Sequence, residues 1–138
     1  MNLEERAGAL QKELERALQE GTSQGNIHMY ESTIAELVRI NDWILEQCQE
    51  NNRVYFEDSG RKYILFKNTT GINFRFFAMK IKIIDNEKVV DTYEVTASNW
   101  MYSKWQRLYF DAQFNEGNIL RIDINSIEYY VMNGKSCN

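Results

Sequence analysis

The chain has 138 residues, and its 43% apolar and 26% charged content is that of an ordinary globular domain. Its net charge of −4 lacks the basic excess that binding of duplex nucleic acid demands. No apolar run reaches the roughly 18 residues of a membrane span. One histidine, His28, and two scattered cysteines, Cys48 and Cys137, are too few for a zinc site or a disulfide scaffold. We therefore expect a cytoplasmic protein without a metal or cofactor.

Charge and aromatic content divide the chain near residue 52. Residues 1–52 contain ten acidic and four basic residues, a net charge of −6, whereas residues 53–138 contain ten acidic and twelve basic residues, a net charge of +2. Sixteen of the eighteen aromatic residues follow residue 52. We predict an acidic helical region over 1–52 and an antiparallel β region over 53–138, which together form one compact unit.

The first predicted helix carries apolar residues every three or four positions, separated by Glu, Gln, Lys and Arg, and ends at Gly21. The apolar seam is narrow, so it could pack inside the chain or pair with a second copy. We predict a homodimer, and its candidate interface residues are Leu3, Ala7, Leu10, Leu14 and Asn41.

The second predicted helix covers about 27–50, after a polar loop over 22–26. Its apolar positions recur at similar spacing and are Ile27, Tyr30, Ile34, Leu37, Ile44 and Cys48, widened by Val38, Ile40 and Leu45. Asn41 interrupts this stripe. Either Asn41 sets register or oligomeric state, or the face turns through Val38 and Leu45 and leaves Asn41 at its edge. The economical arrangement is an antiparallel helical hairpin.

Short apolar and aromatic runs alternate with turns over 58–61, 68–71, 85–88 and 115–118. The runs predict six or seven strands, over 54–56, 62–66, 72–84, 89–96, 108–110, 119–124 and 127–132. Short turns without crossover helices favour an antiparallel β-meander, and hence an α+β fold.

The long strand over 72–84 changes phase. Its even positions are apolar as far as Ala78 and are then occupied by Lys80 and Lys82, whereas its odd positions become apolar from Phe77. A β-bulge near Phe76 would move the buried face in this way. Alternatively, Phe74 and Phe76 are exposed for binding.

No serine, threonine or cysteine stands in a recognisable catalytic pattern beside His28, and no glycine-rich phosphate loop occurs. We predict no catalytic residue, although a hydrolase with a hidden carboxylate pair stays an alternative. The strand over 72–84 interleaves Arg75, Lys80 and Lys82 with phenylalanines, as sheets that bind single-stranded nucleic acid do. A single-stranded nucleic-acid or nucleotide binder is therefore the second hypothesis.

The main expectation is a non-enzymatic protein-binding module with an acidic arm that suits a basic groove. Its 13% aromatic content exceeds what a small core needs, and tyrosine and tryptophan favour interfaces. Small motif-free proteins of phages and other mobile elements often inhibit a host protein by steric occlusion, for example an anti-CRISPR-like protein on a defence nuclease. The candidate contact residues are Glu4, Glu5, Glu13, Glu15, Glu20, Phe74, Phe76, Trp100, Tyr102 and Trp105.

Overall fold

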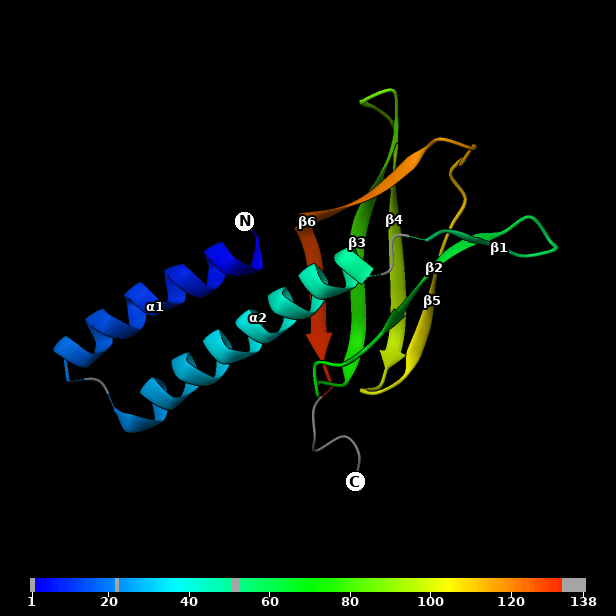
Figure 1. Ribbon diagram of the computed structural model, residues 1–138. Coiled ribbons are helices and arrows are strands. Elements are labelled where there is room, and N and C mark those ends of the chain that lie inside the picture. Colours follow the sequence, from blue (N-terminus) through cyan, green and yellow to red (C-terminus); the bar gives the residue numbers. More distant parts are fainter. Residues whose placement is uncertain (1, 22, 51–52, 133–138) are drawn as a thin grey trace.

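The computed structural model describes residues 2–21, 23–50 and 53–132. Helices α1 (Leu3–Gln19) and α2 (Gln24–Glu50) pack antiparallel ahead of the strands (Figure 1). The strands are β1 (Tyr55–Phe56), β2 (Lys62–Lys67), β3 (Phe74–Asp85), β4 (Lys88–Trp100), β5 (Trp105–Phe110) and β6 (Ile119–Val131). The predicted α+β fold, with a helical hairpin followed by antiparallel strands, is confirmed.

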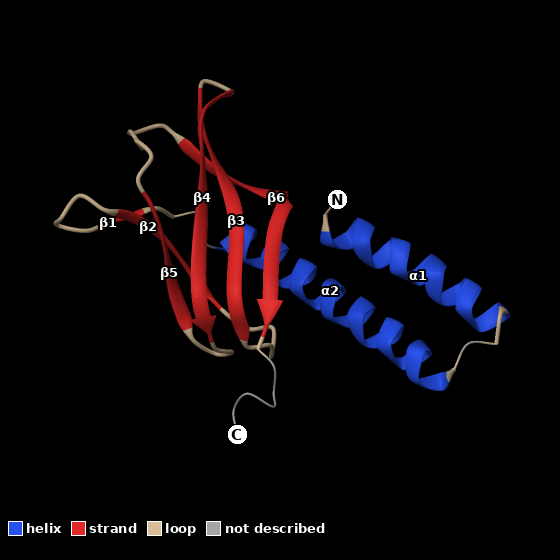
Figure 2. Cartoon of the chain, turned by 180° about the vertical axis from the view of Figure 1, so that it is seen from behind, coloured by secondary structure: helices blue, strands red, loops and turns tan. Residues whose placement is uncertain are grey.

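The strands form two three-stranded antiparallel sheets, here called sheet 1 (β1–β2–β5) and sheet 2 (β4–β3–β6). Their order differs from a simple meander because β2 pairs with β5, and β3 pairs with both β4 and β6. The predicted strands over 119–124 and 127–132 are both parts of β6, which is interrupted opposite Ala78 and Lys80. Strands β4 and β5 lie side by side, which joins the sheets (Figures 1 and 2).

Helix α1 begins at a capped turn, because the side chain of Asn2 accepts a hydrogen bond from the backbone N–H of Glu5 at 2.7 Å. Its apolar seam faces the rest of the chain. Leu3, Ala7 and Leu14 are buried, and Leu10 is half-buried. The seam that motivated the dimer is thus covered within one chain, by contacts with α2 and β6.

Helix α2 buries most of the expected stripe: Ile27, Leu37, Ile40 and Ile44 are buried, and Tyr30 and Ile34 are half-buried. Its deepest side chains are those of Leu37, Ile40, Trp43, Ile44 and Gln47. Asn41 lies half-buried at the edge of this stripe, as one of the two alternatives predicted. The expectation that Val38 and Leu45 widen the buried face is wrong, because the face turns the other way, toward Trp43, and leaves both exposed.

Trp43 is the centre of the core between the hairpin and the two sheets. Its ring lies 5.3 Å from that of Trp100, 5.6 Å from that of Phe77 and 6.3 Å from that of Phe66. Phe74 stacks on Trp43 at 6.0 Å. Helix α2 crosses one face of sheet 2 and ends beside β2, so that one helix closes the core over both sheets (Figures 1 and 2).

The expected change of face in β3 is present and lies at Arg75. Between Phe74 and Phe76 the pairing with β6 shifts by one residue, because Arg75 has no partner. In the neighbouring strand β4, Asn99 has a φ of 53°. Phe74 and its partner Trp100 are consequently buried, whereas Phe76 is half-buried and its partner Ser98 is exposed. In both strands the side that faces the core therefore changes at the same position, at Arg75 in β3 and at Asn99 in β4.

Helix α2 also holds the segment that leaves β2. Arg39, Trp43 and Gln47 recur every four residues and point to this segment from one side of the helix. Arg39 donates to the carbonyl oxygen of Thr70 at 3.1 Å, and Trp43 donates to that of Lys67 at 2.7 Å. The side-chain oxygen of Gln47 accepts from the backbone N–H of Lys67 at 3.4 Å. Both backbone groups of Lys67 are thereby bonded to one helix.

Asn68 joins the two sheets from a fully buried position. Its side-chain amide donates to the carbonyl oxygens of Ile72, at 2.8 Å, and Trp100, at 3.3 Å. Its side-chain oxygen accepts from the backbone N–H and the hydroxyl of Thr70. Both polar atoms of the side chain are therefore bonded inside the protein.

Among the described residues, neither helix combines enough length with enough apolar character to cross a membrane.

Candidate functional site

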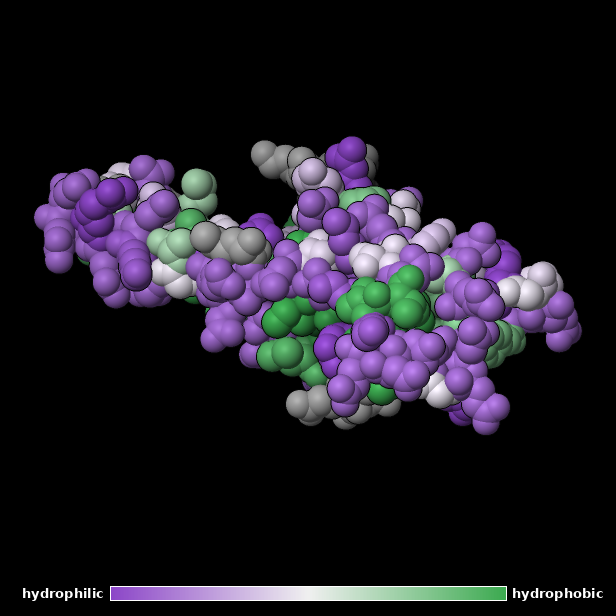
Figure 3. All heavy atoms as spheres, turned by 90° about the horizontal axis from the view of Figure 1, so that it is seen from above, coloured by the Kyte–Doolittle hydropathy of each residue, from purple (hydrophilic) through white to green (hydrophobic). Residues whose placement is uncertain are grey.

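The five glutamates predicted for binding, Glu4, Glu5, Glu13, Glu15 and Glu20, are all exposed along the hairpin. The two ion pairs found among the described residues, Lys82–Asp123 and Arg107–Glu57, both lie in the β region. None of these five glutamates therefore has an ion-pair partner among the described residues. Seen from above, the projecting hairpin is largely hydrophilic (Figure 3).

A hollow of about 320 Å³ lies between the helices at the far end of the hairpin. Glu13 and Glu20 contribute carboxylates, and Met29 and Tyr30 contribute apolar surface. Arg16 also lines the hollow. The hollow thus combines two carboxylates and one guanidinium with apolar surface.

The structure does not bring the five predicted aromatic residues together. Phe74 and Trp100 are core residues and cannot contact a partner in this arrangement. Phe76 is half-buried beside Tyr130, in a shallow hollow on the outer face of sheet 2. Tyr102 is exposed in the turn after β4, and Trp105 is exposed on sheet 1.

The strand over 72–84 has one of its three phenylalanines, half-buried Phe76, on the outer face of sheet 2. Phe77 is fully buried together with Phe74. Lys82 lies 3.8 Å from the carboxylate of Asp123, which also lies opposite Lys80 in the register of β3 and β6. Phe74 and Phe77 thus lie in the core, whereas Arg75, Phe76 and Lys80 stay on the outer face of sheet 2, where Lys82 is paired with Asp123.

A different aromatic and basic surface lies on the outer side of sheet 1. Alternate residues of β2 and β5 point outward, because Ile64, Phe66 and Leu108 fill the core. We call this surface the Tyr–Arg face. It comprises Arg53, Tyr55, Glu57, Arg61, Tyr63, Leu65, Lys67, Trp105, Arg107 and Tyr109.

Three tyrosines form a ladder across the strands of this face. Tyr55 lies opposite Tyr63, and Tyr63 lies opposite Tyr109. The rings of Tyr55 and Tyr63 stack at 5.3 Å, and those of Tyr63 and Tyr109 lie 5.4 Å apart. Such cross-strand aromatic pairs stabilise a narrow sheet as well as shaping its surface.

Each ring of the ladder also carries an arginine. The guanidinium carbon lies 5.0 Å from the ring centre for Arg53 over Tyr55 and 4.8 Å for Arg107 over Tyr63. It lies 3.7 Å from the centre for Arg61 over Tyr109. All three distances are in the range of cation–π contacts.

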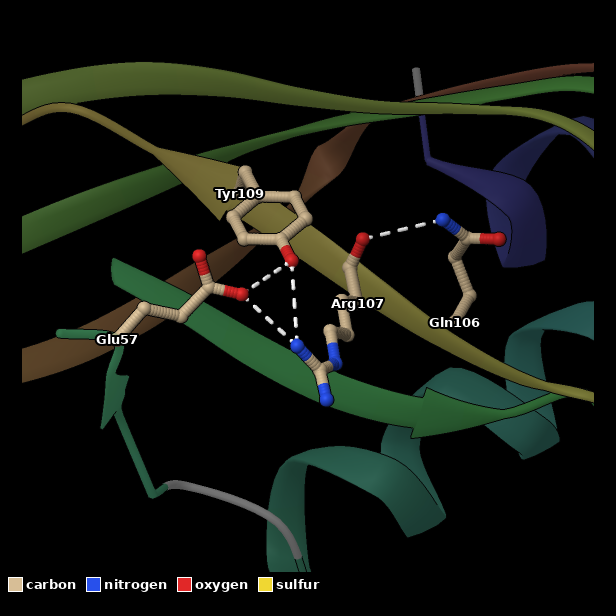
Figure 4. A network of polar contacts seen from close by, with 4 residues as sticks. All are labelled: Glu57, Gln106, Arg107 and Tyr109. Atoms are coloured by element: carbon tan, nitrogen blue, oxygen red, sulfur yellow. Dashed lines mark hydrogen bonds and ion pairs between the residues drawn. The ribbon is translucent and has the colours of Figure 1, made fainter. Parts of the chain in front are cut away.

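Glu57 fixes part of this arrangement, as Figure 4 shows. One oxygen of its carboxylate accepts from the Tyr109 hydroxyl at 2.6 Å and from Arg107 at 2.8 Å. The hydrogen bond from Tyr109, with the nearby arginine charges, holds the pKa of Glu57 below its ordinary value. The contact with Tyr109 is also the main cause that raises the pKa of Arg107. Gln106 points away from this group and donates to the carbonyl oxygen of Arg107.

The described side chains offer no group of three or more His, Cys, Asp or Glu residues that could hold a metal ion. Cys137 and the side chain of Cys48 lie outside the described part of the chain. Comparisons with protein-family models, with curated proteins and with solved structures find no match. The function is therefore inferred from charge, exposure and geometry.

The sequence did not predict the Tyr–Arg face, although one of its two tyrosine pairs follows from a predicted turn. The sequence predicts the turn over 58–61, and pairing about that turn places Tyr55 opposite Tyr63. The remaining partner, Tyr109, comes from a strand more than forty residues later. No local pattern indicates that β2 pairs with β5 rather than with β3.

Proposed function

We propose that the protein is a non-enzymatic protein-binding module. Its acidic hairpin contacts a basic, nucleic-acid-binding surface of a larger protein and occludes it sterically. The observation that carries this proposal is the set of five exposed glutamates on the projecting hairpin, none of which has an ion-pair partner among the described residues.

The geometry of the hairpin supports an electrostatic contact. From Glu4 to Glu20 these carboxylates extend about 24 Å along α1, at 1.5 Å per residue, and they are distributed over more than one side of the helix. Unpaired carboxylates on a rigid helix attract a basic partner over distance and accelerate association. The hollow between Glu13 and Glu20 then gives one lysine or arginine of the partner a defined place.

The test compares two triple variants of the full chain, each with the same change of charge. The first is Glu13→Lys, Glu15→Lys and Glu20→Lys, on the hairpin. The matched control is Glu87→Lys, Glu116→Lys and Glu128→Lys, at exposed positions of the β region. Each is immobilised and compared with the wild type for retention of host proteins at increasing salt.

We expect the wild type and the control to retain the same basic protein, and the hairpin variant to lose it. The wild type should also prevent that protein from binding nucleic acid, because both compete for one surface. Equal retention by the two triple variants would contradict the proposal, as would a captured protein whose nucleic-acid binding is unaffected.

A further inference from the structure

We infer that the Tyr–Arg face is a second binding site, and that its ligand is single-stranded nucleic acid. This site lies at the opposite end of the molecule from the tip of the hairpin (Figure 1) and does not rest on the function proposed for the hairpin.

The charge of the face is opposite to that of the whole chain. It has four cations, Arg53, Arg61, Lys67 and Arg107, and one carboxylate, Glu57, although the whole chain has a net charge of −4. The excess stays positive when the flanking loop residues Asp58, Lys104 and Asp111 are included. A ligand that complements this surface carries closely spaced negative charges.

The aromatic residues narrow the class of ligand further. Trp105 is 55% exposed and lies opposite Lys67, so that a large uncovered ring stands beside a cation. From Trp105 through Arg107 to Tyr109 the outward positions extend about 14 Å along β5, at about 3.4 Å per residue. That length matches the two or three bases that a sheet commonly stacks. A chain that offers both phosphates and flat bases fits better than an acidic peptide, which offers charge alone.

The arginines are held ready for phosphate. Glu57 and the ring of Tyr63 fix Arg107, and the guanidinium carbon of Arg61 lies 3.7 Å from the centre of the Tyr109 ring. An arginine held over a ring by a cation–π contact keeps N–H groups that can bond to phosphate oxygens, and in Arg107 one of these groups is already bonded to Glu57. Less side-chain freedom is then lost on binding than at flexible surface lysines.

The test measures fluorescence anisotropy of a labelled single-stranded DNA against the full-length protein over a range of salt concentrations. Two variants probe the face: Trp105→Ala removes the exposed ring, and Arg61→Gln with Lys67→Gln removes two charges. The matched control is Lys80→Gln with Lys82→Gln, which makes the same change of charge on the outer face of sheet 2.

We expect Trp105→Ala to weaken binding at least about fivefold, the lower end of the effect of one base–aromatic stack. Trp105→Phe should restore part of the loss. The logarithm of the binding constant falls as the logarithm of the salt concentration rises. Arg61→Gln with Lys67→Gln should make this fall shallower, by about 0.7 in slope for each phosphate contact removed. The control should bind like the wild type, and duplex DNA of the same sequence should bind more weakly.

Three results would overturn the inference. The first is no change of anisotropy with the wild type at low salt. The second is an equal loss in the Lys80 and Lys82 control. The third is full displacement by polyglutamate together with unchanged binding by Trp105→Ala, which would show a surface for acidic polypeptide instead. Thermal unfolding of each variant separates loss of binding from loss of fold.

Discussion

At the scale of single residues, the hydrogen bond from the Tyr109 hydroxyl is the main cause that lowers the pKa of Glu57. The carboxylate is stabilised by the Tyr109 hydroxyl, and so its pKa in the folded protein lies below the ordinary value of 4.5. A lowered pKa contributes stability above the unfolded value, and that contribution is lost as the pH falls through the folded value. The Tyr–Arg face is therefore sensitive to acid.

We expect Tyr109→Phe to raise the pKa of Glu57 toward its ordinary value, because the strongest hydrogen bond to the carboxylate is removed. An NMR titration of the Glu57 carboxyl carbon measures this change. Tyr63→Phe is the control, since its ring belongs to the same ladder but its hydroxyl makes no described bond with Glu57. Equal titration in wild type and Tyr109→Phe would contradict the assignment.

Asn68 is the polar residue on which the inner fold depends most. Replacement by alanine leaves the carbonyl oxygens and the Thr70 hydroxyl that it bonds without these partners in a dry region. We expect Asn68→Ala to lower the free energy of unfolding by about 2–3 kcal/mol in denaturant titrations. Thr69→Ala, at the exposed neighbouring position, should change it by less than about 0.5 kcal/mol.

At the scale of elements, the paired change of face in β3 and β4 depends on the backbone of Asn99. A positive φ is costly for most residues and easy for glycine, with asparagine between them. We expect Asn99→Ala to destabilise the fold by about 1 kcal/mol and Asn99→Gly to leave it unchanged or more stable. The denaturant midpoints of the two variants measure these changes in stability. A larger loss of stability in Asn99→Gly than in Asn99→Ala would show that the side chain of Asn99, and not its backbone conformation, stabilises the fold.

The elements themselves were predictable because their signals are local. The helical hairpin, the turns and the bulge near Phe76 follow from spacing within a few residues. The pairing of β2 with β5, and hence the Tyr–Arg face, depends on contacts across the fold that no short segment encodes. The direction in which α2 turns its buried face was missed because Trp43 and Gln47 bond to Lys67, a partner twenty residues away or more.

At the scale of the whole molecule, two leucines one helical turn apart in the hairpin differ in their burial. Leu14 is buried, whereas Leu18 is 56% exposed. We expect Leu14→Asp to lower the free energy of unfolding by at least about 3 kcal/mol, because a carboxylate replaces a packed side chain. Leu18→Asp should retain the fold. Circular dichroism during thermal unfolding measures both.

The homodimer stays a prediction, and light scattering tests it against the 16.4 kDa mass of one chain. If two copies associate through the hairpin, the exposed apolar residues available are Leu18, Met29, Val38 and Leu45. Leu18→Asp would then lower the measured mass without unfolding the protein. A mass of one chain for the wild type would contradict the dimer.

Charge is also arranged over the whole molecule. The hairpin is acidic, and the Tyr–Arg face is basic and aromatic at the other end. If both proposals hold, the hairpin covers the basic surface of a nucleic-acid-binding protein. At the same time, the Tyr–Arg face of sheet 1 binds the single-stranded nucleic acid that this surface would otherwise bind. The two contacts would reinforce each other, because each acts on one half of the same complex.

The hydrogen bonds from Arg39, Trp43 and Gln47 to the end of β2 and the segment that follows it determine which fragments of the protein can fold. A fragment that starts at residue 53 would lack the side of the core that α2 supplies, and would leave the rings of Phe74, Phe77 and Trp100 open to water. Such a fragment would aggregate rather than behave as a β domain. The boundary in composition near residue 52 is therefore not a point at which the protein can be cut, and studies of either end require the intact chain.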